Sequence, residues 1–488
     1  MSCQVKYRST ESESVSVFSA EKGERLYDVL ARNGVTLSAP CGGQGRCGKC
    51  RVRAKGSIRT DEDGTCLSCQ TLVEGDCEVF HEEKAGKILT SGTGKYFDTD
   101  HKQGVGFAVD IGTTTLAAYL CDLDTGDTLA SASMLNPQRI HGADVISRLN
   151  YACSDEKNAQ ELHEEIVQGL KQLLHTLLKN AKRIEEPEQI PCAFVGNTTM
   201  MHFLGDYDAR GIAKAPYLPY YTALHMRLLD LDEAIMGGCI SGYVGADTLA
   251  AMLACDMDKV RDTVLLIDIG TNGELVLSHK GKMMCCSCAA GPAFEGAHIA
   301  CGTGAVEGAI DHLFSKEGGF GYTTIGGIKP AGICGSGLMD IVSYLIENEY
   351  VNAMGRMQEP FRIESDIRVE PQDIREVQLA KAAIAAGIEI LARSMEIDID
   401  EIDRVLLAGG FGNYMDVRSA CRIGLIPETL LQKIQCVGNA AGDGARMLLL
   451  KKENRDRAEA MRKCTQYIDL AAEEDFQDIY TDNLIFDI

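Results

Sequence analysis

Four cysteines are the residues of this sequence whose types and spacing are most suggestive of chemistry. Cys41, Cys47 and Cys50 follow a C-x5-C-x2-C pattern in a glycine-rich stretch, and Cys69 comes later in the chain. Plant-type [2Fe–2S] clusters are held by four cysteine thiolates, whose spacing in the sequence is closely similar to this one. The glycines of the stretch let the backbone curl inward, so that its N–H groups point at the cluster sulfurs. The pattern predicts an electron-transfer centre.

A second pattern, Asp-x-Gly-Thr, occurs twice, each time directly after a predicted strand of buried type. The first copy is Asp110-Ile-Gly112-Thr113-Thr114, and the second is Asp268-Ile-Gly270-Thr271-Asn272. Glycine lets a phosphate approach the backbone, and threonine hydroxyls with successive N–H groups form an anion-binding concavity. The aspartate holds Mg²⁺, usually through water, or orients the attacking water.

A lone Asp-x-Gly-Thr turn is weak evidence, because hairpin turns with Asp and Gly are common. Two copies in matching strand–turn–strand contexts indicate an internal duplication and, together, a nucleotide site. A strand running into Gly409, Gly410 and Gly412 adds a further glycine-rich turn downstream. The sequence contains no GxxxxGK[ST], so this is not a Walker P-loop.

The elements that must position these residues follow from the hydrophobic periodicity. Strands are expected at 3–8, 13–19, 50–54 and 72–80, with a helix at 26–30 that ends by Gly34. In the rest of the chain, strands are expected at 105–109, 116–121, 128–134, 192–195, 264–267, 275–278, 405–407 and 434–437, and helices at about 155–182, at 377–395 and from about 438 onward. Residues 84–104 lack periodicity and are rich in glycine, which predicts a linker.

Charge and composition restrict the partners. The chain has 488 residues and a net charge of −23, which argues against nucleic acid. The basic residues from Arg46 to Arg59 come without an acidic residue between them. They form either a solvated strand edge or a basic rim that docks on an acidic electron-transfer partner.

The same composition suggests a compartment. No apolar run is long enough for a membrane span and the N-terminus has no apolar signal region, so we expect a cytoplasmic protein. Twenty cysteines then stand as thiols or metal ligands rather than as disulfides. Cys285, Cys286 and Cys288 are expected as core thiols, and His141, His202 and His298 as hydrogen-bonded structural residues rather than cobalt ligands.

The first 80 or so residues resemble the β-grasp [2Fe–2S] ferredoxins in element order and cysteine spacing. In that resemblance Cys69 is the fourth ligand, since it heads the next predicted strand and precedes Gln70. Cys66 and the more distant Cys77 are the alternatives. Cys66-x-x-Cys69 also has the spacing of a redox dithiol, but no helix follows it as a thioredoxin-like site requires.

The remaining chain resembles the actin–hexokinase–chaperone (ASKHA) ATPase superfamily, which implies two ribonuclease-H-like lobes with ATP between them. By that family's pattern Asp110, Gly112, Thr113 and Thr114 form the first phosphate loop, and Asp268, Gly270, Thr271 and Asn272 the second. Gly409, Gly410 and Gly412 approach the adenosine, and Gly335 and Ser336 lie near the hinge. Glu274 is either a helper in the site or an exposed strand glutamate.

A ferredoxin head joined to such a body resembles the reductive activators of corrinoid proteins. The local sequences of four segments also resemble those of this family: 136–148, 195–200, 242–247 and 289–296. The resemblance implies ATP-driven, one-electron reduction of inactive Co(II) to Co(I) by the [2Fe–2S] centre in an anaerobic methyltransferase system. The expected cofactors are the cluster and ATP with Mg²⁺. The expected partners are a Co(II) corrinoid protein and an upstream low-potential donor, and the related folds suggest a homodimer through the ATPase body.

The predicted fold class is α+β for the head and α/β for the body. The predicted domains are a β-grasp [2Fe–2S] domain at 1–83, a linker at 84–104 and an ATPase at 105–488, the last divided into lobe I at about 105–258, lobe II at about 262–437 and a C-terminal helix and tail at 438–488. Two other functions fit the same features. One is a ferredoxin-type electron carrier with a regulatory nucleotide-binding body, and the other is a redox-regulated small-molecule kinase.

Overall fold

The protein is described from a computed structural model of its 488 residues. The structure describes residues 2–9, 15–33, 35, 50–61, 64–81, 97–183, 190–228, 233–409 and 414–486. Cys41, Cys47, Gly410 and Gly412, and most of the predicted linker, therefore lie outside the described residues. The chain divides into two compact units: the first contains Met1–Ala85 with Pro137–Tyr151, and the second contains Gly86–Asn136 with Ala152–Ile488.

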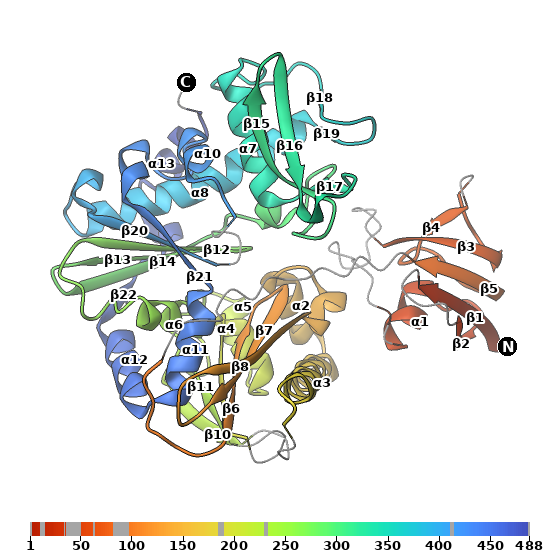
Figure 1. Cartoon of the computed structure of the whole chain (residues 1–488), viewed down its shortest axis with the longest axis horizontal. Coiled ribbons are helices and arrows are strands. Elements are labelled where there is room, and N and C mark those ends of the chain that lie inside the picture. The colour runs from red at the N-terminus through yellow and green to blue at the C-terminus, as the bar shows by residue number, and fades with distance from the viewer. Residues whose placement is uncertain are drawn as a thin grey trace. The chain divides into compact units, whose positions relative to one another are not determined.

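The first unit contains a mixed five-stranded sheet with the strand order β2-β1-β5-β3-β4 (Figure 1). Its strands are β1 (Ser2–Ser9), β2 (Val15–Glu21), β3 (Arg51–Ile58), β4 (Thr65–Leu67) and β5 (Val73–His81). β1 pairs with β5 in parallel, whereas the other neighbouring pairs are antiparallel. In the described residues, this arrangement confirms the predicted β-grasp order of two strands, a helix and further strands.

One face of this sheet carries the core of the unit. Alternating residues of β1 and β3 are buried, as the period of a half-buried strand requires. The helix α1 (Leu26–Arg32) places Leu26, Val29 and Leu30 in the same core. Ile140, from the 3₁₀ helix η1 (Pro137–His141), also packs against it. The opposite face of β3 exposes Arg51, Arg53 and Lys55.

The second unit contains two six-stranded sheets that repeat one pattern (Figure 1). The first has the order β10-β11-β9-β6-β7-β8. Its strands are β6 (Val105–Ile111), β7 (Thr115–Asp122), β8 (Thr128–Leu135), β9 (Cys192–Gly196), β10 (His225–Leu228) and β11 (Glu233–Met236). β6 and β7 are buried along almost their whole length, because other elements cover both faces of the sheet.

The second sheet has the order β21-β20-β12-β13-β14-β22. Its strands are β12 (Val264–Ile269), β13 (Gly273–His279), β14 (Lys282–Cys288), β20 (Arg404–Ala408), β21 (Ile434–Gly438) and β22 (Thr465–Tyr467). In both sheets a strand carrying the aspartate, β6 or β12, pairs antiparallel with the next strand and parallel with a later one, β9 or β20. This match confirms the duplication that the sequence predicted.

Helices cover the two sheets. α3 (Glu156–Asn180) packs against β7 and β8, and α8 (Pro371–Ser394) packs against β13 and β14. α11 (Ala440–Leu450) packs against β6 and β9 and against α6 (Ala246–Ala254). The other α-helices that the structure describes are α2 (Val145–Ser154), most of which belongs to the first unit, and α4 (Thr198–Leu204), α5 (Arg210–Ala213), α7 (Gly335–Glu347), α10 (Val417–Arg422), α12 (Lys452–Cys464) and α13 (Phe476–Asp482).

A smaller sheet, β16-β15-β17, extends the second half of this unit. Its strands are β15 (Ala309–Lys316), β16 (Gly319–Thr324) and β17 (Gly332–Ile333), and α7 packs against β15. A further hairpin is formed by β18 (Phe361–Arg362) and β19 (Arg368–Val369). The C-terminal segment packs on the body, because Phe486 is buried and its N–H donates to Ala353 O at 2.9 Å.

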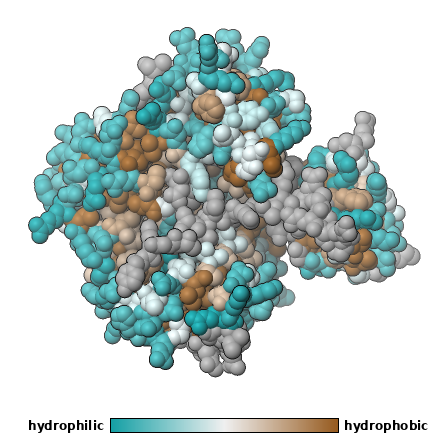
Figure 2. Space-filling model, viewed as in Figure 1, coloured by the Kyte–Doolittle hydropathy of each residue, from teal (hydrophilic) through white to brown (hydrophobic). Residues whose placement is uncertain are grey.

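The visible face of the molecule is largely hydrophilic, with apolar residues scattered among polar ones (Figure 2). This agrees with the large excess of acidic over basic residues. Among the residues that the structure describes, no helix is long and apolar enough to cross a membrane.

Candidate functional site

The first candidate site is a pair of thiols in the first unit. Cys50 directly precedes β3 and Cys69 lies in the turn after β4, and their sulfur atoms are 3.2 Å apart. Ser68 holds this arrangement, since its hydroxyl and its N–H both donate to Cys50 O, at 2.9 and 3.1 Å. Both cysteines are buried. Two converging thiols fixed on one hairpin fit a site that binds a cluster through thiolates.

The surroundings of the pair also suit thiolate ligands. Burial raises the pKa of the Cys50 thiol to about 11, so the thiol keeps its proton unless a cation replaces it. The amide nitrogen of Gln70 lies 3.8 Å from Cys69 Sγ, close enough to donate to that sulfur. Such donors in the surrounding shell orient ligands and tune potentials.

The alternative ligands have other surroundings. Cys66 lies on β4 opposite Val52, with its side chain buried in the core and hydrogen-bonded to Thr71. Cys77 lies on β5, where burial raises its pKa to about 11 and the nearby thiols are Cys66 and Cys3. The structure thus places Cys69, rather than Cys66 or Cys77, against Cys50. Cys41 and Cys47 lie outside the described residues.

The second candidate site is formed where the two Asp-x-Gly-Thr loops meet. Asp110 and Asp268 are the half-buried, last-but-one residues of β6 and β12, and each is close enough to Asp247 to feel its charge. Burial raises the pKa of Asp110 to about 8, with the charges of Asp247 and Asp268 adding to the effect. Burial raises the pKa of Asp268 to about 7, with Asp247 again contributing.

Glu274 and Asp247 complete this acidic cluster. Burial raises the pKa of Glu274 well above its ordinary value, and the charges of Asp247 and Asp268 add to the rise. Glu274 is half-buried on β13 rather than exposed. Burial raises the pKa of Asp247 to about 6. A cation among these carboxylates would favour their ionised forms, and oxygen ligands of this kind suit Mg²⁺.

Each loop is closed by its glycine. The Gly112 N–H donates to Thr115 O and the Gly270 N–H donates to Asn272 O, both at 2.9 Å. A side chain at Gly112 would place its Cβ 2.7 Å from Thr115 O, so only glycine permits this turn. The Asn197 side chain, which caps α4, donates to the Thr113 hydroxyl at 2.9 Å and so fixes the first loop from behind.

One further carboxylate joins the two loops. The Thr114 hydroxyl donates to Glu295 Oε2 at 3.2 Å, and the Thr271 hydroxyl donates to the same oxygen at 2.9 Å. The two predicted phosphate loops are thus brought to one place, with a shared acceptor between them.

Of the other glycines predicted to bind the nucleotide, Gly409 is placed by the structure against the second loop. Gly409 follows β20 with φ +91°, and a Cβ there would lie 2.6 Å from Asp268 Oδ1, so its backbone lies directly against the second aspartate. Gly335 and Ser336 begin α7, where both are buried, and Ser336 contacts Cys334 while the next residue abuts β15. Their part in nucleotide binding stays a prediction. Gly410 and Gly412 lie outside the described residues.

Sequence reasoning missed three members of this site: Asp247, Glu295 and Asn439. Asn439 caps α11, donates to the Tyr119 hydroxyl at 3.3 Å and hydrogen-bonds Asp110, which offsets part of the rise that burial causes in the pKa of that carboxyl. Asp247 and Glu295 belong to the segments 242–247 and 289–296. The sequences of these segments indicated a family resemblance but no role for either residue. None of the three is marked by local spacing, because each meets the loops only in the folded chain.

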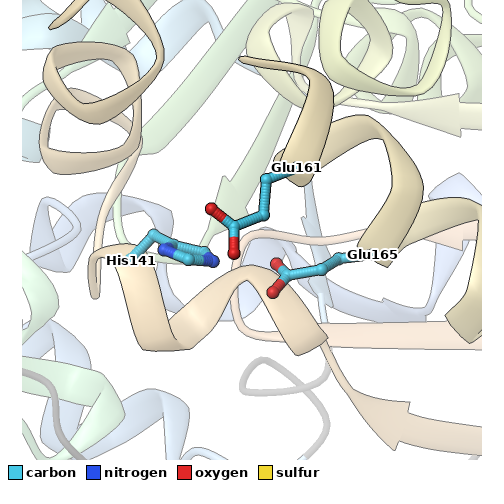
Figure 3. Close-up of side chains that lie close together, drawn as sticks. All are labelled: His141, Glu161 and Glu165. Atoms are coloured by element: carbon cyan, nitrogen blue, oxygen red, sulfur yellow. The ribbon is translucent and has the colours of Figure 1, made fainter. Parts of the chain in front are cut away.

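His202 and the central thiols lie in the interior, as expected of structural residues, whereas His298 is exposed. His202 is fully buried, with Nδ1 2.6 Å from Thr198 O and Nε2 accepting from the Tyr220 N–H at 3.0 Å. Cys285, Cys286 and Cys288 lie in the core on β14. Figure 3 shows Glu161 and Glu165 one turn apart on α3. His141 belongs to the first unit and these glutamates to the second, so no metal site is inferred from the three.

Comparisons with known proteins agree with these sites. Residues 10–74 match a family model described as the 2Fe-2S iron-sulfur cluster binding domain, 105–260 one described as the RACo middle region, and 262–487 one described as the C-terminal domain of RACo, the ASKHA domain.

Two curated relatives and one solved structure are similar over most of the chain. The corrinoid activation enzyme RamQ of Eubacterium limosum is 29% identical, covering 94% of this chain and 95% of its own. The [Co(II) methylated amine-specific corrinoid protein] reductase of Methanosarcina barkeri is 25% identical, covering 77% and 76%. The structure of a reductive activator for corrinoid, iron-sulfur protein matches with a TM-score of 0.72 and 25% identity, covering 99% and 98%.

Proposed function

With a [2Fe–2S] domain ahead of the middle region and the C-terminal ASKHA domain of RACo, the chain belongs to the reductive activators of corrinoid proteins, and we propose that it reduces an inactive Co(II) corrinoid protein to Co(I) in an ATP-driven reaction. The activities named for the two curated relatives support this proposal. The observation that carries it is the presence in one chain of a converging thiol pair and of two phosphate-type loops that meet at an acidic cluster.

The thiol pair supplies the electron-transfer half of this function. We take Cys41, Cys47, Cys50 and Cys69 as the four ligands, of which the structure describes the last two. When bound, a [2Fe–2S] cluster supplies one low-potential electron, at about −400 mV for plant-type sites. Ser68 and Gln70 keep Cys50 and Cys69 in place, through hydrogen bonds to Cys50 O and to the Cys69 sulfur.

The two loops supply the nucleotide half. Asp110 and Asp268 hold Mg²⁺ or orient the attacking water, and the loop residues Thr113, Thr114, Thr271 and Asn272 face the phosphates around the turns made by Gly112 and Gly270. Gly409 brings β20 against Asp268, and Gly410 and Gly412 approach the adenosine. In this assignment Gly335 and Ser336 act from the base of α7.

The nucleotide is needed because the electron transfer is uphill. Reduction of Co(II) to Co(I) demands a potential below that of a plant-type cluster, and each ~59 mV of deficit in a one-electron step costs a factor of ten in the equilibrium constant. ATP helps only by favouring one state of the protein over another. The two loops that contact the phosphates come from different sheets, one in each lobe. A nucleotide bound by both loops therefore favours the state in which the lobes are held together over the state in which they are apart.

The finer assignments extend the same proposal. The corrinoid protein serves an anaerobic methyltransferase system, an upstream low-potential protein reduces the cluster, and two ATPase bodies pair as a homodimer. The exposed basic residues Arg53 and Lys55 on β3 suit an acidic electron-transfer partner. No disulfide joins two cysteines in the described part of the chain, which supports a reducing cytoplasm.

An Asp268→Asn variant tests the proposal. It keeps the shape of the side chain but removes the negative charge, so we expect ATP-dependent Co(I) formation to be lost while the visible spectrum of the cluster is unchanged. Full Co(I) formation by this variant, at the wild-type rate and with the same dependence on ATP, would overturn the nucleotide half of the proposal.

A further inference from the structure

The carboxylate of Glu295 occupies an unusual position for an anion in a phosphate site. One of its oxygens, Oε2, accepts the hydroxyl hydrogens of Thr114 and of Thr271, at 3.2 and 2.9 Å. Thr114 lies on the loop between β6 and β7, and Thr271 on the loop between β12 and β13. The single oxygen therefore joins the two loops, and through them the two sheets.

The chain around Glu295 is built to hold it there. Glu295 ends the short 3₁₀ helix η3 (Pro292–Glu295), in which Ala293 and Phe294 are buried in the core. The next residue, Gly296, has φ +77°, and a Cβ there would lie 2.3 Å from Thr303 O. A buried residue on one side and an obligatory glycine on the other fix the backbone at Glu295. Its side chain is therefore aimed at the two loops by its surroundings.

A phosphate and this carboxylate compete for the same donors. Both are anions that accept hydroxyl hydrogens, and hydrogen bonds to an ionised acceptor are stronger than those between neutral groups. The terminal phosphate of a nucleotide bound between the loops would find the hydroxyls of Thr114 and Thr271 already donated to Glu295. The negative charges of the terminal phosphate and of the Glu295 carboxylate would also repel each other if both groups contacted the same hydroxyls.

We propose that Glu295 is a positioning residue that takes the place of the terminal phosphate. In the nucleotide-free protein its carboxylate holds the two loops together, and it releases both threonine hydroxyls when the γ-phosphate of ATP arrives. ADP has no γ-phosphate and leaves the carboxylate in place. The site thus distinguishes ATP from ADP partly by whether Glu295 is displaced. This inference rests on the proposed function, because it requires a nucleotide between the loops.

The expected effects follow from the hydrogen bonds. Displacing Glu295 breaks two charge-assisted bonds, of which even one is worth about 1.5 kcal/mol, or about tenfold in affinity. In Glu295→Ala neither bond has to be broken, so ATP should bind at least about tenfold more tightly than to the wild type, while the affinity for ADP changes less than about twofold. Glu295→Gln keeps an acceptor without the charge and should fall between the two.

The experiment is a calorimetric titration of the full-length protein with MgATP and with MgADP. It compares the wild type, Glu295→Ala, Glu295→Gln and a matched control, Glu307→Gln. Glu307 is an exposed glutamate of the same lobe, so its change removes one negative charge from the surface of that lobe. To prevent turnover, the ATP arm is repeated with a non-hydrolysable analogue that retains a γ-phosphate. The cluster absorption of each variant reports on its folding and loading.

The proposal expects the ratio of ADP to ATP dissociation constants to rise in the order wild type, Gln, Ala, and to stay at the wild-type value in Glu307→Gln. An unchanged ratio in both Glu295 variants, or equal changes for ATP and ADP, would overturn it. Failure of the wild type to bind either nucleotide would instead overturn the proposed function, and this inference with it.

Discussion

The contact between Gly409 and Asp268 gives the sharpest prediction about the nucleotide site. In Gly409→Ala the new Cβ lies 2.6 Å from Asp268 Oδ1, whereas ordinary van der Waals contact begins at 3.4 Å. The carboxylate must therefore move by roughly 0.8 Å, the difference between these two distances, or the β20 turn must move instead. A displacement of about 1 Å in a catalytic group costs about 100-fold in rate. Because the displacement here is slightly smaller than 1 Å, we expect kcat/KM for ATP hydrolysis to fall by at least about 30-fold.

The backbone strain of the same substitution can be separated from the contact. Gly281, in the turn between β13 and β14, has φ +82°, similar to the φ +91° of Gly409, but its Cβ would meet nothing within 4 Å. Gly281→Ala therefore carries the same left-handed penalty of about 1–2 kcal/mol in unfolding free energy without touching Asp268. Both variants should melt at lower temperature by similar amounts, and only Gly409→Ala should lose ATP hydrolysis.

The assay is steady-state release of phosphate by the two variants and the wild type, with melting followed by scanning calorimetry. The cluster absorption should be the same in all three proteins. If Gly409→Ala hydrolyses ATP within threefold of Gly281→Ala, the close approach of Gly409 to Asp268 has no catalytic importance and the reasoning is refuted.

Two further predictions concern the ligands of the [2Fe–2S] cluster and the pKa values of the carboxylates at the nucleotide site. Cys69→Ser should lose the visible absorption and iron of the [2Fe–2S] cluster, whereas Cys66→Ser should keep both; the reverse result would make Cys66 the ligand. The pKa of Asp110 is raised to about 8 and that of Asp268 to about 7, so the stability that these groups provide below pH 4 is lost as the pH rises through 7 and 8. Without divalent cations the melting temperature of the body should therefore fall between pH 5 and 8, and Mg²⁺ should restore it; a flat profile in high salt, where surface repulsion is screened, would contradict this prediction.

Much of the fold follows from the sequence, because its strands are strongly patterned. The strands around Asp110 and Asp268 are runs of buried apolar residues ending in the same turn, and their repetition predicted the two matching sheets. α2 was not predicted. Asp155 separates it from α3 with extended backbone, φ −154°, and caps α3 by accepting from the Lys157 N–H. A single residue that interrupts a long apolar pattern is difficult to detect from periodicity alone.

The sites were predicted only as far as local spacing reaches. The two Asp-x-Gly-Thr loops carry their own pattern, but Glu295 joins them from a segment with no phosphate-type spacing. The choice between Cys66 and Cys69 had stayed open because both precede β5 at short distance. The folded hairpin separates them, since it turns Cys66 into the core and Cys69 toward Cys50. Contacts of this kind depend on tertiary structure and leave no local trace in the sequence.

The central claim is that ATP drives an electron from this chain to a corrinoid cobalt. The most direct measurement mixes the reduced, cluster-loaded protein with a Co(II) corrinoid protein and follows the Co(I) absorption band, with MgATP, with a non-hydrolysable analogue and without nucleotide. The account predicts that Co(I) accumulates only with MgATP, together with phosphate release. Equal Co(I) formation without nucleotide, or ATP hydrolysis that the corrinoid protein does not stimulate and that yields no Co(I), would contradict it.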